Sequence, residues 1–105
     1  MGIVVQKFGG SSVSSTEKIY NVCKHIIKEY KKGNRVVVVV SAQGKMTDSL
    51  LSQVSEITDI PNKREQDALI SVGEQISSCK LVLCLQELGY EAVSFLRMAS
   101  SHYYR

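Results

Sequence analysis

The chain is poor in the residues that mark several common protein classes. It has no tryptophan and one proline in 105 residues. Its three cysteines (Cys23, Cys79 and Cys84) contain no C-x-x-C pair, which argues against a disulfide framework and against a zinc site. His25 and His102 also lack partners at a metal-ligand spacing, so no metal site is expected. Buried, reduced thiols in a cytoplasmic protein are the expectation.

Charge and hydrophobicity exclude further classes. The net charge of +3 is mild, and the basic residues are spread along the chain, so we expect no nucleic-acid partner. No apolar run approaches the ~18–20 residues of a membrane span. The apolar opening Ile3-Val4-Val5 is too short for a signal peptide. With 44% hydrophobic and 22% charged residues, the composition is typical of one small soluble domain without membrane contact.

The remaining pattern predicts alternating strands and helices. The first half of the chain is predicted to form a strand over Ile3–Phe8, a turn at residues 9–12, a helix opened by a capping box at residues 14–17 and ended by Gly33, and a strand over residues 36–40. A loop at 41–45 then leads to a helix that is capped by Thr47 or Asp48 and broken at Pro61 and Asn62. The last predicted elements are a helix over 63–88, interrupted at Gly73 and ended by Gly89, and a strand over 91–95. The order is therefore β-α-β-α-α-β, which predicts an α/β fold.

Apolar spacing indicates which faces are buried. In the first helix the apolar positions recur at steps of three and four. They are Ile19, Val22, Cys23, Ile26, Ile27 and Tyr30. The second helix should turn Leu50, Leu51, Val54 and Ile57 inward. Five consecutive valines at 36–40 favour a strand buried on both faces. We therefore expect a parallel sheet with helices on both faces, joined by right-handed crossovers.

The first candidate site is Lys7-Phe8-Gly9-Gly10-Ser11-Ser12, where a strand runs through glycines into a helix. Glycine lets the backbone approach a ligand closely, and free amides at a helix start favour an anion. Lys7 adds a positive charge, and the serines add hydroxyl donors. Together these suit a phosphate. The alternative is a plain strand-to-helix turn with a lysine in solvent, because such turns are common.

The second and third candidate sites follow the valine strand and lie in the last helix. The loop at residues 41–45, with Ser41, would face the same crevice as the first loop, because ligand sites in parallel sheets lie beyond the carboxyl ends of strands. Thr47 could instead serve only as a helix cap. Gly73 inside a helix needs a reason such as a close approach, and Glu74 beside it could bind an ammonium group. A surface glutamate near a helix break is the alternative.

These three segments together resemble aspartate kinases. The opening Val-Gln-Lys-Phe-Gly-Gly-Ser-Ser-Val at residues 5–13 is similar to the family signature. So are Val-Val-Val-Ser-Ala-x-Gly-Lys-x-Thr-Asp at 38–48 and Ser-x-Gly-Glu-x-Ile-Ser at 71–77. Other amino-acid kinases share a Lys-x-Gly-Gly-Ser start without this combination. The resemblance implies an incomplete amino-acid kinase (carbamate-kinase-like) domain over residues 1–95.

The resemblance also implies an activity and residue roles. Aspartate kinases use ATP with Mg²⁺ to phosphorylate the side-chain carboxylate of L-aspartate, giving 4-phospho-L-aspartate, the first step toward lysine, methionine, threonine and diaminopimelate. The resemblance implies that Lys7 has the catalytic role and that Thr47 and Glu74 contact the aspartate. The residues that it implies at ATP are Lys7, Phe8, Gly9, Gly10, Ser11 and Ser41.

Residues 96–105 depart from that family pattern. The family continues after Ser94-Phe95 with Thr-Gly-x-Gln-Ala-Gly, which this chain lacks. Met98 is encoded by ATG and Ala99 by a codon starting with G, so the next reading frame contains TGG, a tryptophan codon. We therefore expect a frameshifted tail, with a natural C-terminus of unrelated origin as the alternative.

The chain is accordingly expected to be truncated and inactive by itself. The family's kinase domain is more than twice as long, and its second half supplies nucleotide-binding loops. The alternative is a non-enzymatic half-domain that binds phosphate or dimerises. Because strands would lack neighbours, we expect a homo-oligomer or an aggregation-prone fragment.

Overall fold

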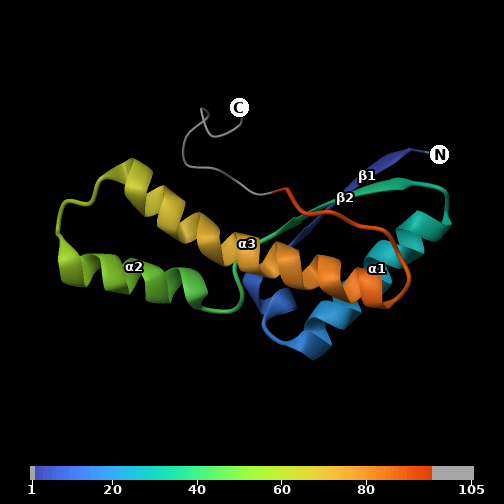
Figure 1. Ribbon diagram of the computed structural model, residues 1–105, viewed down its shortest axis with the longest axis horizontal. Helices are drawn as coiled ribbons and strands as arrows, with labels where there is room; N and C mark the ends of the chain where they lie inside the picture. Colours follow the sequence, from blue (N-terminus) through green and yellow to red (C-terminus); the bar gives the residue numbers. More distant parts are fainter. Residues whose placement is uncertain (1, 96–105) are drawn as a thin grey trace.

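The computed structural model describes residues 2–95, so His102 and the predicted tail lie outside the described residues. Its elements are β1 (Ile3–Phe8), the 3₁₀ helix η1 (Gly10–Val13), α1 (Thr16–Lys31), β2 (Arg35–Val40), α2 (Met46–Ile57) and α3 (Lys63–Glu87) (Figure 1). The predicted α/β class is confirmed. The predicted last strand is not: residues 91–95 run past α3 without forming a strand.

The sheet consists of β1 and β2, which pair in parallel from Ile3 opposite Arg35 to Phe8 opposite Val40. Helix α1 connects the two strands, as the β-α-β prediction requires. The parallel register matters for the site, because it brings the carboxyl ends of both strands to the same edge.

The core lies on one face of this sheet. Phe8, Val36 and Val38 pack toward a buried cluster that α1 and α3 both supply. The members of this cluster are Val13, Ile19, Val22, Cys23, Ile26, Val40, Leu81 and Leu85. Burying side chains of this size stabilises the fold by about 1.5–3 kcal/mol each. Strand and helix propensity alone could not hold two strands together, so this cluster holds the sheet in place.

The opposite face of the sheet is open. Successive strand residues point to opposite faces, and on this face Val5, Val37 and Val39 are 57%, 50% and 49% exposed. We expected helices on both faces of the sheet, but within residues 2–95 helices cover only one face. The reason is that α1 and α3 both contribute to the single cluster on the same side of β2. Exposure of part of the valine strand agrees with the expected uncovered apolar surface.

Helix α1 follows its predicted pattern with a different start. Ile19, Val22, Cys23 and Ile26 are buried, and Gly33 ends the helix with a φ of +92°, which only glycine adopts readily. The predicted capping box is wrong. The N-cap is Ser15, whose side chain accepts from the Lys18 amide at 3.2 Å, so the serine and glutamate of the S-x-x-E pattern are out of register by one residue.

The cysteines are only partly as expected. All three are free thiols, and Cys23 is fully buried, which raises its pKa to about 11, with a further contribution from Cys84. Cys79 is exposed, contrary to the expectation of buried thiols. It lies on α3 between the buried positions Ser77 and Leu81, two residues from each, and therefore on the opposite side of the helix.

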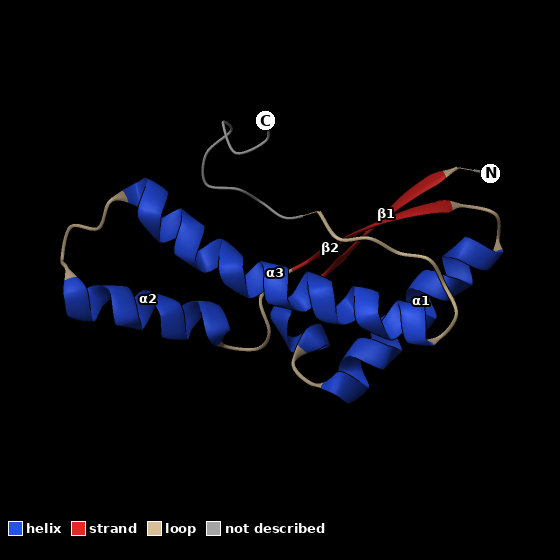
Figure 2. Cartoon of the chain, in the orientation of Figure 1, coloured by secondary structure: helices blue, strands red, loops and turns tan. Residues whose placement is uncertain are grey.

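Helices α2 and α3 form a hairpin that extends beyond the sheet, on the side away from α1 (Figure 2). No residue of α2 is fully buried. Leu50 and Val54 are half-buried, whereas Leu51 and Ile57 are exposed, so the predicted inward apolar face forms only in part. The physical reason is that α3 is the principal neighbour of α2. Helix α3 runs through Gly73 without the predicted interruption, and Gly89 ends it with a φ of +90°.

Helix α3 is long and apolar enough to cross a membrane, judged only by length and composition. Its most apolar 18-residue window has a mean hydropathy of 1.4, and 28% of that window is buried. Its Leu81 and Leu85 belong to the core cluster. A core helix of a soluble domain passes the same test, so the helix by itself is weak evidence for a membrane protein.

The open sheet face generates the first prediction. Replacing Val37 and Val39 by threonine keeps β-branched side chains in the strand and reduces the apolar area on that face. We expect wild-type chain to associate at rising concentration and the double variant to shift toward monomer. Light scattering across a concentration series measures the shift. Val72→Thr, at a comparably exposed valine on α3, is the control, and equal association of all three proteins would contradict the prediction.

Candidate functional site

The candidate site lies where β1 and β2 both end. The Ser41 amide donates to the Phe8 carbonyl at 3.1 Å, and the Gly44 amide donates to the Gly10 carbonyl at 2.9 Å. These two hydrogen bonds join the loop after β1 to the loop after β2. The predicted proximity of the two loops at one sheet edge is confirmed.

Gly10 is the closest point between the two loops. A Cβ built on Gly10 would lie 2.7 Å from the Ala42 carbonyl oxygen and 2.9 Å from that of Gly44. Such contacts require the backbone to move, so this position excludes every side chain. Gly9 differs, because a Cβ there would meet nothing within 4 Å. The two glycines of the motif therefore have separate reasons: Gly10 allows loop packing, and Gly9 leaves an open surface.

The first loop offers backbone donors. It folds into η1, so α1 begins only at Thr16. The prediction that the glycine turn leads directly into the N-terminus of this helix is therefore wrong. The Ser12 amide donates to the Gly9 carbonyl at 3.1 Å. Among residues 2–95, the hydrogen bonds leave the amides of Gly10 and Ser11 without an acceptor. Two free amides beside an open glycine are suited to an anion.

Positive charge borders both loops. Lys7 is exposed and lies on the open face of the sheet opposite Val39, and its side chain forms neither an ion pair nor a hydrogen bond with the described residues. Lys45, at the end of the second loop, is likewise exposed and unpaired within that part of the chain. Phe8 is placed differently, because its side chain packs toward the core and its carbonyl already accepts from Ser41. Ser11 and Ser41 are exposed beside the loops.

Gly73 explains how α3 reaches the loops. A Cβ there would lie 2.8 Å from the Ala42 Cβ and 3.1 Å from the Met46 Sδ. The glycine therefore lets α3 pack directly on the second loop and the start of α2. This contact accounts for a glycine that costs about 1 kcal/mol in a helix. It also places the helix that carries Glu74 against the second loop.

Glu74 and Thr47 are both half-buried and available. Neither side chain makes a hydrogen bond or ion pair with another described residue. Thr47 is not a helix cap, since α2 starts at Met46 after Lys45, with no side-chain cap. Its hydroxyl is therefore free to bind a ligand. A partly buried carboxylate without a partner favours a cation, and the ammonium of an amino acid is one.

Sequence reasoning missed one interaction at the loops. The Gln43 side chain donates from Nε2 to the Val13 carbonyl at 2.8 Å, and its Oε1 accepts from the Lys80 ammonium at 2.8 Å. Gln43 occupies the unspecified position x of the second motif, and its partners lie 30 and 37 residues away. No local sequence pattern predicts a contact between residues that far apart in the chain.

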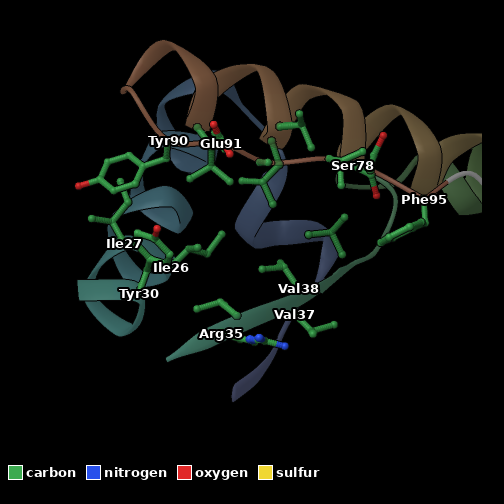
Figure 3. Close-up of a pocket in the computed structure, with 18 residues that line it drawn as sticks. Ile26, Ile27, Tyr30, Arg35, Val37, Val38, Ser78, Tyr90, Glu91 and Phe95 are labelled. Carbon is green, nitrogen blue, oxygen red and sulfur yellow. The ribbon is translucent and has the colours of Figure 1, made fainter. Parts of the chain in front are cut away.

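A separate cavity lies away from these two loops. About 430 Å³ in volume, it runs along β2 beneath α3 and the segment after Gly89. Figure 3 shows Tyr90, Glu91 and Phe95 on one side of it and Val37 and Val38 on the other. None of the predicted site residues lines it. The cavity is largely apolar and borders the β2 edge that β1 leaves unpaired, so it is where the missing third strand would have been expected.

Fold, loop geometry and motifs together define a class. The pattern of the amino acid kinase family matches residues 2–102, and the chain belongs to that family. The match includes part of the predicted tail, and the predicted boundary at residue 95 stays a prediction.

The relatives are aspartate kinases. The aspartokinase of Geobacillus stearothermophilus is 55% identical over 94 residues, and aspartokinase 2 of Bacillus subtilis is 55% identical over 95. Each match covers 90% of this chain and 23% of the relative, so the chain spans about a quarter of their length. The crystal structure of aspartate kinase from Synechocystis superposes with a TM-score of 0.83 at 47% identity, covering 89% of this chain and 16% of that one. The predicted resemblance to aspartate kinases is confirmed.

The glycine geometry yields the second prediction. Gly10→Ala forces a Cβ against two carbonyl oxygens and should destabilise the chain by about 1–3 kcal/mol, the scale of an overpacked site. Gly9→Ala is the matched control, because the neighbouring glycine has open space and a φ of −77° that alanine adopts freely. Urea unfolding followed by circular dichroism measures both. Equal stability of the two variants would show that the loops do not pack as described.

Proposed function

We propose that this chain forms the phosphate- and aspartate-contacting part of an aspartate kinase. In the reaction, a side-chain carboxylate oxygen of L-aspartate attacks the γ-phosphorus of ATP. The bond from that phosphorus to the β,γ-bridging oxygen breaks, leaving ADP and 4-phospho-L-aspartate. The observation that carries the proposal is the joining of the two loops at the carboxyl ends of β1 and β2, with α3 packed on the second loop through Gly73.

The first loop supports the phosphate role. Negative charge spreads over the transferring phosphoryl group and the leaving phosphates, and preorganised donors stabilise it. The free amides of Gly10 and Ser11 and the unpaired ammonium of Lys7 are such donors, and Gly9 leaves room for close approach. Lys7 is accordingly proposed as the catalytic residue. Ser11 and Ser41 add hydroxyl donors at the same edge.

The third segment supports the aspartate role. The unpartnered carboxylate of Glu74 pairs with the substrate ammonium, and the Thr47 hydroxyl donates to a substrate carboxylate. Half-burial strengthens both interactions, since water competes less for the charged groups. The proposed roles are physically separate: cationic and amide donors lie at the first loop, and the carboxylate of Glu74 lies on α3.

Mg²⁺ is expected with ATP, and the described residues do not supply its site. No group of three or more His, Cys, Asp or Glu side chains among residues 2–95 could hold a metal ion. The ion usually keeps waters and binds through substrate phosphates with one or two carboxylates. It would therefore arrive with the nucleotide. We propose that the isolated chain, which spans about a quarter of the relatives' length, is inactive. We also propose that the whole protein serves lysine, methionine and threonine synthesis.

The Lys7 role is tested in a chimera. Residues 1–95 replace the matched segment of the Geobacillus stearothermophilus aspartokinase, which supplies the remaining three-quarters. Lys7→Ala should lower kcat by at least ~10²-fold, the scale of one lost electrostatic contact. Lys24→Ala, at an exposed lysine of α1, is the control. Turnover near that of the unmodified chimera would make Lys7 a surface lysine, and an inactive unmodified chimera would refute the proposed function.

The Glu74 role is tested in the same chimera. Glu74→Gln should raise the KM for aspartate about 10- to 100-fold, the scale of a hydrogen bond to a charged group, and leave the KM for ATP nearly unchanged. Glu87→Gln, at an exposed glutamate near the end of α3, is the control. Steady-state kinetics with each substrate varied separates the two constants, and an unchanged aspartate KM rules out the assignment.

The alternative function is that of a non-enzymatic half-domain that binds phosphate. The free amides of the first loop favour this alternative. Calorimetric titration of the 105-residue chain with ATP distinguishes it. Saturable binding without turnover supports a phosphate-binding module, and the chimera experiments decide whether that binding belongs to a kinase.

A further inference from the structure

The side chain of Gln43 joins three segments that are distant in the sequence. Its Nε2 donates to the carbonyl of Val13 at the end of η1, and its Oε1 accepts from Lys80 on α3, each at 2.8 Å. Because Lys80 can only donate and a carbonyl can only accept, the two partners fix which way the amide points. Within residues 2–95 this is the one side chain that hydrogen-bonds the second loop to the first.

Each end of this bridge has a physical reason. Val13 is fully buried, and as the last residue of η1 its carbonyl has no acceptor role within that helix, so a donor from elsewhere is required. Lys80 is exposed, so its ammonium can keep contact with water while it donates to Gln43. Gln43 is half-buried between them.

The bridge gives α3 a second attachment to the loops. The first is the packing of Gly73 on Ala42. Lys80 lies seven residues further along, about 10 Å on a helix axis, and its contact resists rotation and tilt of α3 about the first point. Glu74 lies between the two attachments. Its position relative to the phosphate loop is therefore set by both.

We propose that Gln43 and Lys80 form a clasp that positions Glu74 relative to the phosphate loop, and so sets the alignment of the two substrates. This inference rests on the proposed function. Gln43 and Lys80 are positioning residues, because neither is placed on substrate. A misalignment of about 1 Å can lower a rate by as much as ~10²-fold, so the clasp should affect the transfer step more than the binding of either substrate.

The clasp is tested first in the 105-residue chain. Lys80→Met keeps the length of the stem and removes the donor, and Gln43→Ala removes both bonds. Losing one hydrogen bond should speed hydrogen exchange of the Gly44 amide about fivefold, while amides in the middle of α1 stay unchanged. Lys80→Arg, which retains a donor, should restore slow exchange, and Lys24→Ala is the control. Nuclear magnetic resonance resolves each amide.

Kinetics in the chimera supply the positional readout. Lys80→Met should lower kcat about tenfold with both KM values within about twofold, and Lys80→Arg should recover most of it. Slow Gly44 exchange in Lys80→Met, equal to that in Lys24→Ala, overturns the clasp. A fall in kcat and a rise in both KM values together also overturns positioning. If the unmodified chimera is inactive, the proposed function fails while the exchange experiment still decides whether the clasp exists.

Discussion

Gly10 has no space for a side chain, and the arrangement of the candidate site depends on that constraint. The parallel pairing of β1 with β2 brings the two loops to one edge, and the missing Cβ lets them close to hydrogen-bonding distance. Gly73 imposes the same constraint on α3, because the absence of its Cβ lets this helix pack on Ala42. Glycines at two close approaches thus bring three segments of the chain together without any ligand.

The charges around these approaches are distributed by role. Amides and lysines lie on the side of the loops, and the unpartnered carboxylate of Glu74 lies on the helix. Among residues 2–95 the ion pairs are local: Lys32 with Glu29 and Lys63 with Asp67 are three and four residues apart, and such exposed pairs contribute little to stability. Within the described part of the chain, the charged side chains of Lys7, Lys45 and Glu74 form no ion pair, which suits a site that takes charged ligands.

The open sheet face and the apolar cavity along β2 have a common cause. Both border strands whose neighbours on that side are absent from residues 2–95, and the relatives are about four times as long as the matched segment. Exposed valines and an unpaired strand edge are costly in an isolated domain. Covering these surfaces would remove that cost, which is why we expect this chain to associate.

Local chemistry by itself determined much of this protein: the paired strands, the buried face of α1, the glycine stops at Gly33 and Gly89, and the three motifs that identify the family. These follow from periodicity and backbone conformation, which act over a few residues. Tertiary structure decided the rest. The 91–95 strand did not form, α2 stayed partly exposed, and Gln43 met Lys80, because each outcome depends on neighbours tens of residues away that no local pattern encodes.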